Sequence, residues 1–312
     1  MKYNWFEHAT PFTKFLLTLF LMLGCFLGAL VIAVIVAIPF THMSANAILS
    51  ASTVIQNPLY LNLLKYLQVV QSIALFIIPA FLVSYLFGYK PGEYLKLKRI
   101  PAVKILIIAL GLIIVIIPLI NFLEEMNSRL QLPASLKSIE NWMKTSESTA
   151  NTLSEIFLKV NNVKGLLFNL FMMALLPALG EEFMFRGIFQ RLFSEMFKNY
   201  HWGIICSAAL FSAIHFQFYG FVPRMLLGVI FGYMLVWSGT IWIPVIAHFL
   251  NNAIGVIFYF LLSKGMVNNS LDNIGTGNKE VQISMISLFL SSALLYLFYI
   301  VSKRQNEKGI LN

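Results

Sequence analysis

Five ionisable residues in the second half of the sequence have the types and spacing of an acid–base site. They are Glu181, Glu182, Arg186, His215 and His248. A positioned carboxylate can draw a proton from a water molecule, and an imidazole N–H can donate a hydrogen bond to a developing oxyanion. The combination therefore indicates hydrolysis by an activated water molecule.

Helical geometry assigns different roles to the two glutamates. Glu182 and Arg186 are four residues apart and share one helix face, where they can form an ion pair. Glu181 points about 100° away from Glu182 and about 140° away from Arg186, so it can face a cavity. Burial disfavours the charged form of a carboxyl group, which suits a general base. We expect Glu181 to be the base and Glu182–Arg186 the supporting pair, on a helix unbroken at Gly180.

Each histidine has a neighbour one helical turn away on the same face. Phe211 precedes His215 by four residues and can line the wall of the cavity, although packing is the usual role of a phenylalanine. Asn252 follows His248 by four residues, and an imidazole beside a carboxamide can donate hydrogen bonds to an oxyanion. Asn251 is a weaker candidate for the same task.

A structural explanation exists for these groups as well. The glutamates can close a helix at the membrane surface, where Arg186 and Arg191 would meet lipid head groups. A single histidine in a membrane helix is often a packing residue that donates a hydrogen bond. Ionisable residues inside a membrane are costly and usually functional. Because the carboxylate pair recurs with two histidines, the functional interpretation is favoured.

The composition is that of a polytopic membrane protein. Apolar residues make up 59% of the chain and charged residues 11%, and the mean hydropathy is +0.79, whereas soluble domains carry about 25% charged residues. The net charge of +9 comes with no basic run or aromatic–basic platform. The expected partner is therefore the lipid bilayer and its anionic phosphates, with no nucleic acid. Cys25 and Cys206 lie in apolar runs and are expected to be packing residues.

We expect about eight membrane-spanning helices, because eight apolar runs approach or reach the length that crosses a bilayer. They cover residues 15–40, 67–88, 105–122, 165–180, 202–219, 225–237, 241–262 and 283–301. The fourth run continues into an amphipathic helix at residues 181–197. The expected fold is an all-α membrane protein with a polar catalytic cavity between the fourth, fifth and seventh helices.

No internal repeat or second domain is visible, so residues 1–312 are expected to form one polytopic membrane domain. Segment 123–164 carries mixed charges and many Ser, Thr and Asn residues. We expect it to be an extracytoplasmic loop that caps the outer face or lies along it, with a short helix from Ser154. Segment 263–281 is rich in Asn and Gly, which is typical of a flexible loop.

The distribution of positive charge predicts that both termini face the cytoplasm. Segments 1–14, 89–104, 181–201 and 302–312 together carry 13 Lys and Arg against 6 acidic residues. The rest of the chain carries 9 against 7, and five of these 9 positive residues are spread over the long segment 123–164. The positive-inside rule therefore places the first four segments inside, as in a bacterial inner membrane protein.

Three short motifs resemble those of a known family. Residues Glu181–Arg186 read E-E-F-M-F-R, Phe211–His215 read F-S-A-I-H, and His248–Asn252 read H-F-L-N-N. They are similar to the EExxxR, FxxxH and HxxxN motifs of the CPBP (Abi) family of CaaX proteases and bacteriocin-processing enzymes. The resemblance covers about residues 164–262, which would be the catalytic core.

The resemblance implies an intramembrane endopeptidase that acts on a membrane-associated protein or peptide, of which prenylated CaaX-like proteins are one class. In the family the first glutamate activates water with help from the FxxxH histidine, and the HxxxN pair stabilises the oxyanion. These roles carry over to Glu181, His215, His248 and Asn252. The alternatives are a non-catalytic immunity or scaffold protein of the same family and, less favoured, a proton-coupled transporter.

The use of a metal is the main mechanistic alternative. Zinc would take Glu181, His215 and His248, with one position open for water. The sequence lacks the short HExxH spacing, and these ligands would come from three different helices. The metal-free mechanism, with no cofactor, is therefore the one favoured.

The expected spans leave the residues of the site at unequal depths. From Trp242, the helical rise puts His248 roughly 9 Å deep, and Glu181 lies about 6 Å from the same face. A straight fifth span from Trp202 would put His215 about 20 Å deep. A later start of the fifth helix, a tilt, or a kink that takes Glu181 deeper would each remove the difference.

Overall fold

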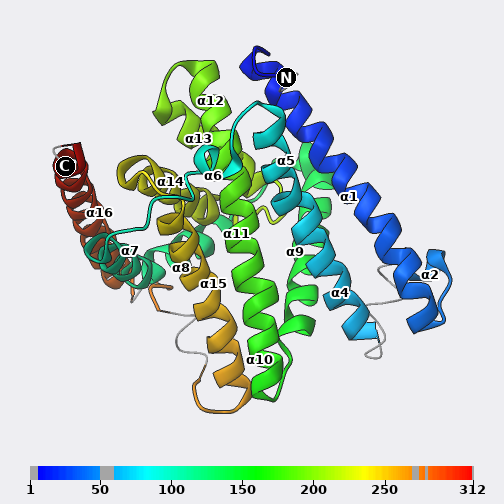
Figure 1. Ribbon diagram of the computed structural model, residues 1–312. Coiled ribbons are helices and arrows are strands. Elements are labelled where there is room, and N and C mark those ends of the chain that lie inside the picture. The colour runs from blue at the N-terminus through cyan, green and yellow to red at the C-terminus, as the bar shows by residue number, and fades with distance from the viewer. Residues whose placement is uncertain (1–5, 50–59, 269–273, 278–279, 311–312) are drawn as a thin grey trace.

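The computed structural model describes residues 6–49, 60–268, 274–277 and 280–310, and every regular element in these ranges is helical (Figure 1). Met1, Asn312 and part of the predicted 263–281 loop lie outside the described residues. The central helix spans Val163–Phe197. The elements before it are α1 (Pro11–Thr41), α2 (Ala45–Leu49), α4 (Leu61–Ser72), η2 (Ile73–Ile77), α5 (Ile78–Leu86), α6 (Pro91–Tyr94), α7 (Val103–Val115), α8 (Ile117–Ser128), η3 (Ala134–Leu136) and α9 (Lys137–Leu158).

The second half of the chain contains the central helix and the elements around it. They are α10 (Val163–Asn169), η4 (Leu170–Leu175), α11 (Leu176–Glu182), η5 (Phe183–Phe189), α12 (Gln190–Phe197), α13 (Tyr200–Ala213), α14 (Phe221–Ser238), α15 (Trp242–Ser263) and α16 (Val281–Ile310). The elements η2, η4 and η5 are π-helical turns that continue their neighbouring α-helices.

Six helices are long and apolar enough to cross a membrane. They are Pro11–Thr41, Leu61–Leu86, Val163–Phe197, Phe221–Ser238, Trp242–Ser263 and Val281–Gln305. The pair α7 and α8 is a seventh candidate and is bent by 42°, at a place where Pro118 lacks the N–H of a helical hydrogen bond. The prediction of an all-α multi-pass membrane protein is confirmed.

The count among the described residues is six or seven candidate spans, and the predicted eight is not confirmed. The predicted fifth span, 202–219, differs most, because α13 has 14 residues and ends at Ala213. A helix of this length covers only about 21 Å. The residues that follow form a non-helical connection to α14, and His215 lies in that connection.

The helix with the two glutamates begins two residues before the predicted start and ends at the predicted Phe197. Residues 163–197 form one helix of 35 residues, roughly 52 Å by the helical rise, with Glu181 near its middle. The buried apolar residues Phe183, Met184 and Phe185 directly follow the glutamates, so the charged pair interrupts the span and does not end it. The helix is unbroken at Gly180, as predicted, and there a Cβ atom would come 2.9 Å from the Cβ atom of Phe76 on η2.

Most of segment 123–164 is helical, and the long helix begins earlier than the predicted Ser154. The amphipathic helix α9 has 22 residues and starts at Lys137. Its buried Glu140 accepts hydrogen bonds from Lys137 and Lys144, one turn away on either side. Trp142 packs against the ring of Phe218, with centroids 5.1 Å apart. The helix therefore covers the connection that carries His215.

The segments with excess positive charge gather at one end of the molecule (Figure 1). Phe15 near the start of α1 packs on Phe193 of α12. Thr240, after α14, donates a hydrogen bond to the carbonyl of Arg99, and Arg99 lines a small cavity together with Gln305 of α16. The described parts of the four segments predicted to share one face of the membrane thus lie toward the same end, apart from Glu181 to Arg186 in the middle of the 163–197 helix.

Candidate active site

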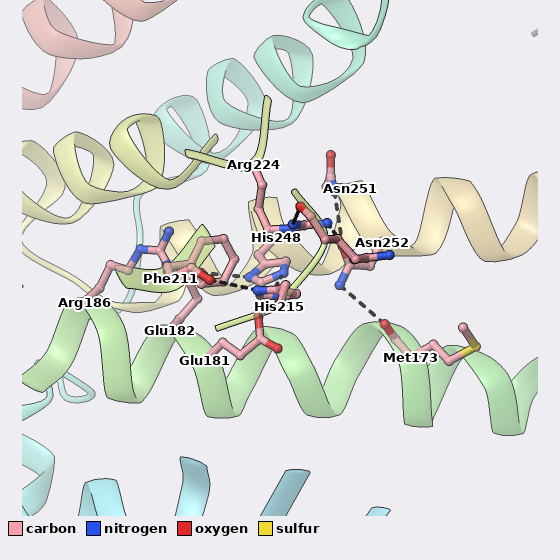
Figure 2. A network of polar contacts seen from close by, with 11 residues as sticks. Met173, Glu181, Glu182, Arg186, Phe211, His215, Arg224, His248, Asn251 and Asn252 are labelled. Atoms are coloured by element: carbon pink, nitrogen blue, oxygen red, sulfur yellow. Dashed lines mark hydrogen bonds and ion pairs between the residues drawn. The ribbon is translucent and has the colours of Figure 1, made fainter. Parts of the chain in front are cut away.

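The seven residues predicted to be catalytic or supporting come together between the central helix, α13 and α15 (Figure 2). Glu181 and Glu182 end α11, and Arg186 follows in η5. Phe211 lies in the last turn of α13, and His215 is two residues beyond its end. His248 and Asn252 lie on α15. The side chains of Glu181, His215 and His248 lie level with one another despite the unequal depths expected from the spans, because Glu181 is within 4.0 Å of both histidines.

The inner half of the cluster, formed by Glu182, Arg186 and the Nδ1 side of His248, is buried. Glu182 is fully buried, and its Oε1 atom lies 2.9 Å from Arg186 Nη1 and 2.8 Å from His248 Nδ1. The predicted Glu182–Arg186 pair is thus present in the structure. It is a charge contact without a well-aligned hydrogen bond through Nη1, while Arg186 Nη2 donates to the carbonyl of Gly228.

Two aromatic rings enclose the guanidinium of Arg186. Its carbon lies 4.5 Å from the ring centroid of Phe211 and 5.5 Å from that of Phe231. Such contacts stabilise a desolvated cation. With its side chain 1% exposed, Arg186 does not face lipid head groups, which removes the structural explanation for this residue.

The outer half of the cluster faces a cavity. Glu181 Oε2 lies 3.8 Å from His248 Nε2 and 4.0 Å from His215 Nε2. These separations are too long for direct hydrogen bonds and short enough for a water molecule to bridge them. The three atoms therefore surround a position that suits the water molecule of a hydrolytic reaction.

Hydrogen bonds at Nδ1 fix how both imidazoles present Nε2 to Glu181. His215 Nδ1 contacts the carbonyl of Phe211 at 2.8 Å, and His248 Nδ1 contacts the Glu182 carboxylate. Because both partners are acceptors, Nδ1 carries the proton in each ring, and Nε2 of a neutral ring carries a lone pair. His248 therefore needs a second proton before it can donate to an oxyanion.

Asn252 bonds to the backbone of the central helix. Its Nδ2 atom donates to the carbonyl of Met173 at 3.4 Å, and Asn251 Nδ2 donates to Asn252 Oδ1 at 3.1 Å. Pro177, four residues after Met173, has no N–H for an α-helical bond to this carbonyl. Asn252 thus supplies a donor where the helix lacks one, and Asn251 orients its carboxamide.

The cavity has a volume of about 1130 Å³ and a polar and an apolar part. Glu181, His215, His248 and Asn252 line the polar part, whereas Glu182 and Arg186 are not among the residues that line it. The apolar part lies along α1 and α4 and is lined by Met22, Phe26, Leu30, Leu64 and Leu67. The cavity therefore extends beyond the predicted fourth, fifth and seventh helices.

Two further residues of the cavity wall were missed by the sequence reasoning. Arg224 lies in the first turn of α14, and Gln217 lies in the connection after His215. Arg224 immediately precedes the predicted sixth span, 225–237, and therefore looked like the charged end of a helix. A signal was available, because Arg224 stands only nine residues after His215.

The donor types around Glu181 are those that zinc prefers. The Nδ1 partners of His215 and His248 resemble the outer hydrogen bonds of zinc-bound histidines. In the part of the chain that the structure describes, however, no three His, Cys, Asp or Glu side chains are grouped to hold a metal ion as they stand. The zinc mechanism and the metal-free mechanism therefore remain two alternative predictions.

Comparison with known proteins supports the resemblance. Residues 163–254 match the family described as Rce1-like, type II CAAX prenyl endopeptidases. The uncharacterized protein YpbD of Bacillus subtilis (strain 168) is 29% identical over 86 residues, which cover 26% of this chain and 41% of YpbD. No solved structure matches the chain.

The fold and the comparison agree on the class of the protein. The helices define an integral, multi-pass membrane protein, and the matched segment contains all seven predicted site residues. This segment is thus of the CPBP type, in the group of CAAX-type intramembrane proteases.

Proposed function

We propose that the chain is a CPBP-type intramembrane endopeptidase that hydrolyses a peptide bond of a membrane-associated protein or peptide. The observation that carries this proposal is the position of Glu181 Oε2, 3.8 and 4.0 Å from two histidine Nε2 atoms at the wall of the cavity. A transporter would not require these atoms to surround one water position. Prenylated CaaX-like proteins are one class of substrate that the apolar part of the cavity can accept.

In the proposed reaction, a water molecule lies between Glu181 and His215. Glu181 takes a proton from the water as its oxygen attacks the carbonyl carbon of the substrate. The resulting oxyanion accepts hydrogen bonds from doubly protonated His248 and from Asn252, which gives up its bond to Met173. Glu181 then delivers the proton to the nitrogen of the leaving amine, and the C–N bond breaks. Both products leave with the atoms of one water molecule added.

Glu182 and Arg186 hold this arrangement in place. The Glu182 carboxylate accepts from His248 Nδ1, which orients the ring. Arg186 balances the charge of Glu182 without entering the cavity. The proposed mechanism uses no metal or other cofactor.

Terminal proteomics of membranes tests the function. Membranes with the wild-type chain are compared with membranes with Glu181→Gln, looking for a new protein terminus that depends on Glu181. The matched control is Glu195→Gln, which removes an exposed carboxylate paired with Arg191. A terminus that persists in Glu181→Gln membranes, or no Glu181-dependent terminus at all, would argue for the immunity or scaffold alternative.

We further propose that the end of the molecule with excess positive charge faces the cytoplasm of a bacterial cell. Lys198 follows α12 and Lys159 precedes α10, and both lysines are exposed. The helices α12 and α10 lie at opposite ends (Figure 1). In a chain whose Cys25 and Cys206 are replaced by Ser, an impermeant maleimide should label Lys159→Cys and not Lys198→Cys in intact cells. The reverse pattern would invert the orientation.

A further inference from the structure

Arg224 lines the same cavity as Glu181 and His215, and the proposed hydrolytic reaction does not use it. It lies in the first turn of α14 and is half-buried. Its side chain extends from α14 toward the cluster around His248 (Figure 2). A permanent positive charge thus stands at the wall of a cavity that is apolar over much of its surface.

The contacts of Arg224 are with neutral oxygens. Its Nη2 atom donates to Gln217 Oε1 at 2.7 Å, and its Nη1 atom donates to the Gln217 carbonyl at 3.4 Å. Arg129, Arg186 and Arg191 each pair with a glutamate four residues away. The ion pairs between described residues do not include Arg224.

The surroundings hold the guanidinium in place. Gln217 Nε2 donates to Asn151 Oδ1 of α9 at 3.3 Å, so the carboxamide is fixed with its oxygen toward Arg224. A Cβ atom on Gly220 would come 3.0 Å from Arg224 Nη2. The absence of a side chain at Gly220 thus leaves room for the guanidinium against the connection.

The carboxylates of Glu147, Glu181 and Glu124 attract the charge of Arg224 from a distance, and no ion pair between described residues joins them to it. A charge beside apolar surface is costly unless it is closely paired. Glu124 lines the same cavity, while Glu147 accepts a hydrogen bond from the N–H of Tyr219. The guanidinium of Arg224 has five N–H donors, and its two hydrogen bonds to Gln217 use only some of them. The remaining N–H groups can bind a planar acceptor with two oxygens.

We propose that Arg224 binds a carboxylate of the peptide substrate and thereby selects which peptides are cleaved. This inference rests on the proposed function. The carboxylate is either the free C-terminus of the peptide or an Asp or Glu side chain near the cleaved bond. Both present the same planar pair of oxygens, and matched peptides distinguish them.

The test uses the full-length chain in lipid vesicles and a library of N-acylated peptides as the probe. Each peptide is made with a free C-terminal carboxylate and as the C-terminal amide, and each Asp or Glu is also replaced by Asn or Gln. Mass spectrometry gives kcat/KM for each member of a pair. A charge-assisted bond contributes about 1.5–3 kcal/mol, so the wild type should prefer the carboxylate form of one kind of pair by roughly 10- to 100-fold.

Three variants distinguish binding of the substrate carboxylate from structural support of the connection that carries His215. Arg224→Gln should remove the preference, because it lowers kcat/KM for the carboxylate form far more than for the amide form. Arg224→Lys should keep part of the preference, because it keeps the charge without the fork. Arg129→Gln, which removes an exposed guanidinium, is the matched control and should keep the full preference.

Two results would overturn the proposal while the proposed function stands. One is a wild type that cleaves both forms equally. The other is an Arg224→Gln variant that slows both forms by the same factor, as expected if Arg224 only braces the connection with His215.

If the wild type cleaves no peptide, the proposed function fails for this library, and a binding measurement decides the inference. Vesicles with Glu181→Gln should retain the carboxylate peptide over its amide partner. Vesicles with Glu181→Gln and Arg224→Gln together should lose that difference. Equal retention of the two forms by Glu181→Gln would overturn the role of Arg224.

Discussion

Glu181 and Glu182 are neighbours in the sequence, and the structure gives them opposite surroundings. Glu182 is fully buried, contacts Arg186 and His248 closely, and does not line the cavity. Glu181 lines the cavity and has histidine nitrogens only at 3.8 Å and beyond. A helix that passes between a packed core and a cavity thus separates one carboxylate in the core from one that faces the cavity.

The two arginines of the site differ in the same way. Arg186 is 1% exposed at its side chain and has a carboxylate and two aromatic rings around it. Arg224 lines the cavity and contacts a neutral side chain. The inner half of the site is therefore held by contacts within the chain, whereas the outer half is open to the cavity.

The largest effect is expected for Glu181→Gln, which should lower kcat by up to about 10⁴-fold because the general base is lost. The fold should be unchanged, since the contacts of the Glu181 carboxylate with the two histidines are too long for hydrogen bonds. Cleavage assays and thermal unfolding in detergent measure the two effects. A Glu181→Gln protein with wild-type activity would assign the base to another group.

The second prediction concerns Glu182→Gln, which should destabilise the protein by about 3–5 kcal/mol because it leaves a buried Arg186 without its charge partner. Activity should fall in part, since His248 loses the acceptor that orients its ring. Glu195→Gln is the exposed control, and surface pairs are worth about 0–1 kcal/mol. If Glu182→Gln abolishes cleavage while Glu181→Gln only loses stability, the roles of the two glutamates are exchanged.

The sequence predicts the Glu182–Arg186 ion pair well but predicts the position of this pair along the membrane-spanning helix poorly. The i,i+4 spacing of Glu182 and Arg186 is a local property, and the ion pair forms as expected. The end of the span is not local, because Phe183, Met184 and Phe185 are buried by packing from other helices. A charged residue inside a span therefore looks like its end in the sequence.

Contacts between distant segments are the part that periodicity does not reveal. His248 and Glu182 are 66 residues apart in the sequence, so the motif spacing predicted neither their hydrogen bond nor the resulting tautomer. Arg224 was missed for a related reason. Its role depends on Gln217 and on the cavity, and both become visible only once α14 is placed against the connection after α13.

The last prediction separates the metal-free mechanism from the zinc mechanism through His248 and Asn252. If both donate to the oxyanion, the loss of either donor should lower kcat by about 10²–10³-fold with little change in substrate binding. His248→Gln keeps a donor of similar reach and should retain part of the activity. Asn252→Ala should be as damaging as His248→Ala.

A zinc site makes the opposite prediction for the same variants. His248→Gln would remove a metal ligand, so bound metal and activity should disappear together, whereas Asn252→Ala should do far less because Asn252 bonds to the Met173 carbonyl. Elemental analysis of the purified wild type, with 1,10-phenanthroline inhibition as a second readout, measures the metal directly. Stoichiometric zinc that is lost in both His215→Ala and His248→Ala would overturn the metal-free mechanism, because their Nε2 atoms would then bind the metal in place of water and the oxyanion.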